Sequence, residues 1–143
     1  MSRLNIIIAE DEALIALDLR CMCEDAGHRV LSEARSAGEA RQVFSALVPD
    51  LLLTDMDLAE GSDGVEVVRD LRRHAPDTCI VFVTATSDQS TLDRISAVQP
   101  DMVLAKPVTE LDLERAFRLA QGAVAQSATH GALRHRQPHQ GAK

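Results

Sequence analysis

Residues 51–58 read LLLTDMDL, an apolar run that stops at two carboxylates. A short, continuous apolar run with polar residues after it is typical of a strand covered on both faces, as in parallel sheets. In open parallel sheets the ligand site lies outside the carboxyl ends of the strands. The stretch therefore predicts a buried strand that delivers Asp55 and Asp57 to a functional edge of a sheet.

The strand-like pattern recurs along the chain. We expect strands at residues 4–9, 28–34, 51–54, 79–83 and 102–105, each followed by an amphipathic helix. Regular alternation of strands and helices is the pattern of a parallel sheet that carries helices on its faces. The sequence therefore predicts a doubly wound α/β fold with a five-stranded parallel sheet.

The sequence predicts which side of the first helix is buried and which residues cap the later helices. In residues 12–26 the apolar side is expected to contain Leu14, Leu17 and Cys21, with Ile15, Leu19 and Met22 beside them. Short polar side chains accept hydrogen bonds from the free N–H groups at a helix start. Ser87 and Thr109 are therefore expected to cap the fourth and fifth helices.

The extent of the folded part follows from where the apolar periodicity ends. The chain has 143 residues, which suits one domain. Beyond Val124 the sequence is polar and contains Gly131, Pro138 and Gly141. We therefore expect one domain over residues 1–124 and a disordered tail over residues 125–143.

Composition and charge exclude two classes of partner. Hydrophobic residues make up 45% of the chain, and no apolar run approaches the roughly 18 residues that span a bilayer. The N-terminal segment MSRLNIIIAEDE does not have the layout of an export signal. The formal charge of −7 argues against binding nucleic acid through a basic face. We expect a cytoplasmic protein that contacts neither a membrane nor nucleic acid.

Reactive side chains fall at the ends of the expected strands. These residues are, in chain order, Glu10, Asp11, Asp55, Asp57, Thr84 and Lys106. Because the carboxyl ends of parallel strands share one edge, we expect these side chains to converge. Carboxylates about 4 Å apart repel each other by roughly 4 kcal/mol at an effective dielectric of about 20, so a cation must be present.

The expected cluster suits magnesium and a phosphoryl group. Protein oxygens with room left for water and a phosphate are ligands that Mg²⁺ prefers. Lys106 adds a compact positive charge and Thr84 adds a hydroxyl donor, so that a phosphoryl group could bind between them. A carboxylate can be the nucleophile in phosphoryl transfer. Asp55 is the candidate, because its strand lies between the acids and the strands of Thr84 and Lys106.

These residues resemble those of the receiver domain of two-component response regulators, in its stand-alone, single-domain form. The resemblance covers residues 3 to about 124, and the matching residues are Glu10, Asp11, Asp55, Thr84, Lys106 and Pro107. It implies a flavodoxin-like fold with the strand order 2-1-3-4-5.

The resemblance also implies roles. Asp55 would accept a phosphoryl group from a histidine kinase or a phosphotransfer protein. Asp11 would bind Mg²⁺ directly and Glu10 largely through water, with the backbone carbonyl of Asp57 as another ligand. Such a protein is not an enzyme acting on other molecules; at most it slowly loses its own phosphoryl group.

The output is expected to pass through protein contact. The resemblance places Lys106 and Thr84 on the phosphoryl group. A downstream partner is expected on the surface of the fourth helix, fifth strand and fifth helix, and a homodimer is compatible with the sequence. That surface would include Thr91, Arg94, Val98 and Val103.

The chain departs from the family pattern in three places. Val103 stands where an aromatic switch residue is common, and the chain has no Tyr or Trp. The loop 56–63 lacks the usual proline and is one residue longer before Gly64. Glu10 replaces the commoner Asp, which moves that carboxylate by one methylene.

Two other functions agree with parts of the pattern. Asp55-Met56-Asp57 also resembles the nucleophile motif of haloacid dehalogenase-type phosphatases, although that class has its metal-binding acid pair late in the chain. A receiver-like interaction module that is never phosphorylated is the third candidate, because the aromatic switch residue is missing.

Overall fold

The computed structural model describes residues 2–136, which contain five strands and five helices. The strands are β1 (Asn5–Ala9), β2 (Arg29–Ala34), β3 (Leu51–Thr54), β4 (Cys79–Thr84) and β5 (Met102–Ala105). The helices are α1 (Ala13–Asp25), α2 (Ala37–Phe44), α3 (Gly64–Arg72), α4 (Gln89–Ala97) and α5 (Glu110–Arg136).

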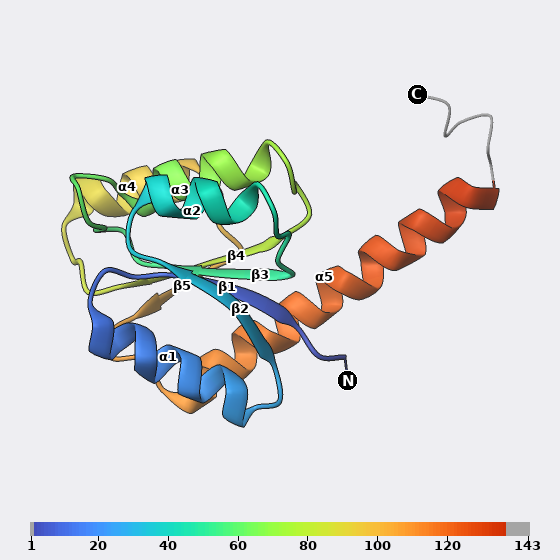
Figure 1. The fold of residues 1–143 in the computed structure, drawn as a ribbon, viewed down its shortest axis with the longest axis horizontal. Helices are drawn as coiled ribbons and strands as arrows, with labels where there is room; N and C mark the ends of the chain where they lie inside the picture. The colour runs from blue at the N-terminus through green and yellow to red at the C-terminus, as the bar shows by residue number, and fades with distance from the viewer. Residues whose placement is uncertain (1, 137–143) are drawn as a thin grey trace.

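The strands form one parallel sheet in the order β2-β1-β3-β4-β5. Helices α2, α3 and α4 cover one face, and α1 and the first part of α5 cover the other (Figure 1). The predicted doubly wound fold and strand order are confirmed.

Both faces of the sheet are buried, which explains the continuous apolar runs of the central strands. In β3, Leu52 belongs to the core beneath α2 and α3, whereas Leu51 and Leu53 belong to the core beneath α1 and α5. All three side chains are at most 1% exposed. Successive strand residues point to opposite faces, so a strand covered on both sides needs apolar residues at every position.

The predicted buried face of α1 is wrong in part. Leu14 and Leu17 are 81% and 53% exposed, and Cys21 is exposed as well. The buried residues of this helix are Ala16, Leu19 and Cys23. Helix α1 has apolar side chains around more than half of its circumference, so periodicity alone could not select the face that meets the sheet.

Helix α5 is longer than the sequence analysis predicted. It continues to Arg136, so residues 125–136 of the expected disordered tail are helical, and residues 137–143 lie outside the described part. Ala125 and Gln126, the first residues after Val124, are exposed but still helical, so the loss of apolar periodicity does not mark the end of the helix. Residues 125–136 include three Ala and two Arg, which are good helix formers and can extend a helix that has already formed.

The helix starts match the expected chemistry, with one change. Thr109 Oγ1 accepts a hydrogen bond from the Asp112 N–H at 3.1 Å, as a capping residue does. Helix α4 is capped by Asp88 rather than by Ser87, since Asp88 Oδ2 accepts from the Thr91 N–H at 3.0 Å.

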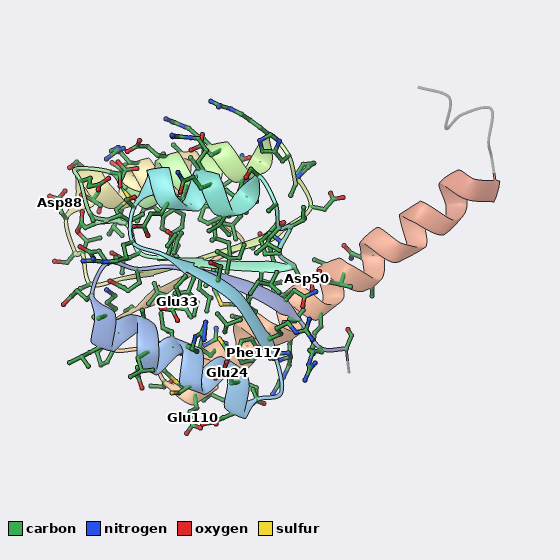
Figure 2. All side chains as sticks on the ribbon, viewed as in Figure 1. Glu24, Glu33, Asp50, Asp88, Glu110 and Phe117 are labelled. Carbon is green, nitrogen blue, oxygen red and sulfur yellow. The ribbon has the colours of Figure 1, made fainter. Side chains whose placement is uncertain are left out.

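The parallel strands give the molecule two distinct ends. Asp50 precedes β3 and Asp88 follows β4, and Figure 2 shows these residues at opposite ends of the domain. The carboxyl ends of the strands lie at the end marked by Asp88. Within residues 2–136, no helix combines the length and the apolar character needed to cross a membrane.

Candidate functional site

Three carboxylates meet at the carboxyl edge of the sheet. Glu10 and Asp11 follow β1, and Asp55 follows β3, which pairs directly with β1. One oxygen of each lies within 4.8 Å of the others. Glu10 and Asp55 are only 2% and 7% exposed, so their charges are poorly solvated. The convergence predicted from the sequence is present for these three residues.

Lys106 supplies the opposing charge. It follows β5, and its Nζ lies 3.0 Å from Asp55 Oδ2 and 2.9 Å from Glu10 Oε1. Burial alone would lower the pKa of Lys106, but the two carboxylates outweigh that effect and raise it. The ammonium is therefore held in its charged form, in contact with the carboxylates that follow β1 and β3.

Glu10 is incompletely compensated in spite of this contact. Its Oε2 accepts a hydrogen bond from the Glu12 N–H at 3.1 Å. Its Oε1 forms an ion pair with Lys106 Nζ at 2.9 Å but makes no well-oriented hydrogen bond, whereas Asp55 Oδ2 accepts one from the same ammonium. Burial raises the pKa of Glu10, and the Asp55 charge adds to the rise, against the lowering effects of Lys106 and of the Glu12 N–H.

The donor set fits a hard divalent cation. The clustered ligand atoms are all carboxylate oxygens, which suit Mg²⁺ better than zinc or copper. The Glu10 oxygen that lacks a hydrogen bond is a buried acceptor of the kind that a cation or its water would satisfy. Glu10, Asp11 and Asp55 are therefore the residues that would hold the ion.

Two predicted residues lie outside this cluster. Asp57 is exposed, and its carboxylate is not among the clustered ligand atoms, so only its backbone carbonyl could take the role that the resemblance implies. Thr84 ends β4 and is 3% exposed, and its Oγ1 accepts from the Thr86 N–H at 3.3 Å. Thr84 thus lies at the same sheet edge as the cluster, on the neighbouring strand.

Asp55 is held by the backbone around it. Its N–H donates to the Ala9 carbonyl at 2.9 Å, and its Oδ1 accepts from the Met56 N–H at 2.7 Å. Its carbonyl accepts from Thr54 Oγ1 at 2.8 Å, and Gly64 approaches this carbonyl so closely that a Cβ there would lie 2.3 Å from the oxygen. These contacts leave Oδ2 for Lys106.

Residues 57–63, which we call the acceptor hairpin, form the loop that the sequence predicted to be unusual. An antiparallel bridge joins Asp57 to Asp63, and the Leu58 N–H donates to the Ser62 carbonyl at 3.0 Å. Glu60 and Gly61 at the turn have φ of 62° and 67°. Two successive residues with positive φ close a tight hairpin turn, so the loop is ordered without a proline.

The acceptor hairpin is also attached to its surroundings. The Ala59 N–H donates to the Arg35 carbonyl at 2.9 Å, and the Ala37 N–H donates to Ser62 Oγ at 3.0 Å. Asp63 caps α3 in a reciprocal capping box with Glu66. This box was not among the predicted caps, although the spacing of Asp63 and Glu66 is its signature.

Comparison with known proteins identifies the family. The family model of the response regulator receiver domain matches residues 6–118. The chain belongs to this family. Receiver domains are parts of two-component systems; they generally bind Mg²⁺ at an acidic pocket and interact with histidine kinases and downstream partners.

Individual relatives agree with this assignment. The receiver domain is 37% identical to the phyllosphere-induced regulator PhyR of Methylorubrum extorquens, over 72% of this chain and 38% of PhyR. It is 33% identical to the transcriptional regulatory protein PdtaR of Mycobacterium tuberculosis, over 81% of this chain and 56% of PdtaR. The chain thus spans only about half or less of these relatives.

A solved structure confirms the fold of the receiver domain. The signal receiver domain of a modulated diguanylate cyclase from Desulfovibrio desulfuricans G20 superposes with a TM-score of 0.79 at 32% sequence identity. The match covers 87% of this chain and 99% of that one.

In this receiver domain Glu10→Gln is expected to increase stability at neutral pH and to weaken Mg²⁺ binding about tenfold or more. The folded-state pKa of Glu10 is raised, so the folded state favours the neutral carboxyl. Wild-type stability therefore falls as pH rises through the folded pKa, and the variant lacks this loss.

Urea unfolding of both proteins between pH 4 and pH 8, without Mg²⁺, measures the effect. The stability difference should be largest at the high end of this pH range and shrink toward 4.5, the ordinary pKa of a Glu carboxyl. A difference independent of pH, or greatest in acid, would contradict the assigned cause.

Proposed function

We propose that the protein accepts a phosphoryl group on Asp55, with Mg²⁺, from a histidine kinase or a phosphotransfer protein. The observation that carries the proposal is the position of Lys106, whose Nζ bridges Asp55 Oδ2 at 3.0 Å and Glu10 Oε1 at 2.9 Å. A cation in contact with the nucleophile and the acid pair is suited to a transferring phosphoryl group. The reaction is expected to take place in the cytoplasm.

The chemical step uses residues that are already in place. A carboxylate oxygen of Asp55 attacks phosphorus, the bond from phosphorus to the donor breaks, and its electron pair leaves with the donor. Lys106 stabilises negative charge on the phosphoryl oxygens, and Thr84 supplies a hydroxyl from the next strand. Mg²⁺ held by Glu10 and Asp11 would add positive charge where these oxygens lie.

The product is an acyl phosphate that acts as a signal. The protein is not proposed to turn over an external substrate; slow hydrolysis of its own acyl phosphate resets it. The output partner is proposed to bind the surface of α4, β5 and α5, where Arg94 is exposed and Val103 is 45% exposed. The same surface could join two copies of the chain as a homodimer.

Intact-mass measurement after incubation with acetyl phosphate and Mg²⁺ tests the proposal. We expect a gain of one phosphoryl group, no gain with chelator in place of Mg²⁺, and loss of the group in hydroxylamine, which cleaves acyl phosphates.

The two alternatives predict different outcomes. A phosphatase would release phosphate continuously from phosphate esters, with turnover that exceeds the amount of protein. A passive interaction module would gain no phosphoryl group from acetyl phosphate or from any histidine kinase. The early position of the acid pair, directly after β1, argues against the phosphatase.

A further inference from the structure

An ion pair connects the acceptor hairpin to helix α4. Arg94 lies on α4, and its Nη2 donates to Asp63 Oδ2 at 2.8 Å. Asp63 ends the hairpin and is 19% exposed at its side chain, whereas Arg94 is 55% exposed. The contact joins the segment directly after the phosphoacceptor to the helix that borders the proposed output surface.

Asp63 uses its two oxygens for two different elements. Oδ1 accepts from the Glu66 N–H at 3.0 Å and caps α3, while Oδ2 accepts from Arg94. The Asp63 backbone is bridged to Asp57, two residues after Asp55. A displacement of α4 therefore acts on the hairpin strand that carries the Asp57 carbonyl.

Helix α4 has a second attachment, just beyond its last turn. The guanidinium of Arg72, on α3, donates to the carbonyls of Val98 and Gln99 directly after α4. Arg94 lies in the last turn of α4, so the contacts of Arg72 and Arg94 both hold the C-terminal part of this helix. Arg94 is the contact in the described part of the chain that ties α4 to the acceptor hairpin through side chains.

We propose that Arg94 is a positioning residue, which holds the acceptor hairpin through Asp63 and thereby couples Mg²⁺ binding to helix α4. The inference rests on the proposed function, in which Mg²⁺ is bound, and on the ligand role that the receiver resemblance implies for the Asp57 backbone carbonyl. Val103 cannot provide the ring movement of an aromatic residue, so the ion pair offers a route from site to surface that does not need one.

Thermodynamic linkage makes the coupling reciprocal. If binding of the ion favours the hairpin position that Arg94 also favours, loss of Arg94 must weaken binding by the same factor by which the ion strengthens the α4 contact. Partly exposed ion pairs have modest energies, which sets the expected change at about two- to fivefold in Kd.

The test is Mg²⁺ titration of the ¹⁵N-labelled 143-residue chain, read from backbone amide shifts without any phosphoryl donor. Arg94→Gln removes the pair, and Arg94→Lys keeps the charge. Asp63→Asn weakens the pair but preserves the cap, because Asn caps helices as well as Asp does. Arg35→Gln is the matched control: it removes a positive charge beside the hairpin, while the hairpin bond uses the Arg35 backbone carbonyl.

A purely electrostatic effect of Arg94 and a positioning effect predict different changes in Mg²⁺ affinity among these variants. By electrostatics alone, Arg94→Gln should tighten Mg²⁺ binding and Asp63→Asn should weaken it. Positioning predicts that both weaken it about two- to fivefold, that Arg94→Lys partly restores it, and that Arg35→Gln does not weaken it. The Mg²⁺-induced shifts of residues 89–97 should shrink in both pair variants and persist in the control.

Wild-type or tighter binding in Arg94→Gln would overturn the inference, as would unchanged α4 shifts in both pair variants. Absence of Mg²⁺ binding in wild type would overturn it too. Failure of the proposed function is seen separately, as absence of phosphoryl uptake by mass, and can occur while the Mg²⁺ coupling is present.

Discussion

Asp55→Asn is expected to abolish phosphoryl uptake completely while leaving the domain folded. The amide oxygen can still accept from the Met56 N–H, which lies 2.7 Å from Asp55 Oδ1 in the wild type. The amide nitrogen cannot act as the attacking oxygen, and it replaces an anion that Lys106 contacts at 3.0 Å. Removal of one of three crowded carboxylates relieves repulsion and so offsets the loss of the ion pair with Lys106, and the domain is expected to stay folded in the absence of Mg²⁺.

Intact mass after exposure to acetyl phosphate and Mg²⁺ measures this result, with thermal unfolding as the check on folding. Asp57→Asn is the control. It removes one negative charge two residues after Asp55, from a side chain that is exposed and lies outside the carboxylate cluster. We expect the control to take up one phosphoryl group. Phosphorylation of Asp55→Asn at another residue would show that the acceptor is misassigned.

Gly64→Ala is expected to destabilise the fold by about 2 to 4 kcal/mol and to slow phosphorylation. A Cβ at this position would lie 2.3 Å from the Asp55 carbonyl oxygen and 2.8 Å from Phe82 Cε2. The carbonyl belongs to the backbone between Asp55 and the acceptor hairpin, so it cannot rotate away as a side chain could. The clash must displace either the start of α3 or the phosphoacceptor.

Chemical denaturation gives the stability change, and the initial rate with acetyl phosphate gives the functional one. Gly122→Ala is a matched control in α5, where an added Cβ meets nothing within 4 Å. Because Ala favours helix over Gly, the control should be stabilised by about 0.5 to 1 kcal/mol. Wild-type stability in Gly64→Ala would mean that the close approach is not tight in solution.

The fold was predictable because its signals are local and repeated. Runs such as residues 51–54 are apolar at every position, which in a chain of alternating strands and helices indicates a sheet covered on both faces. Two features were not predictable from periodicity. Leu14 lies on a helix that is apolar on several sides, and the backbone beyond Val124 stays helical without apolar periodicity.

The site was predictable to the extent that topology determines it. Parallel strands bring Glu10, Asp11, Asp55 and Lys106 to one edge of the sheet, independently of the loop conformations. The structure of the acceptor hairpin was harder to predict, because it depends on a backbone hydrogen bond to Arg35 and on a turn with positive φ. Pairs between distant segments, such as Arg94 with Asp63, leave no periodic signal in a single sequence.

The contact of Lys106 with Glu10 and Asp55 stabilises the site when no metal ion is bound. The ammonium is tethered to β5 and acts as a permanent counterion for Glu10 and Asp55. Structural metal sites lose their fold when the metal leaves, because nothing else neutralises their ligands. Here Lys106 supplies part of the neutralising charge from within the chain, so the ends of β1 and β3 are held together without a bound ion.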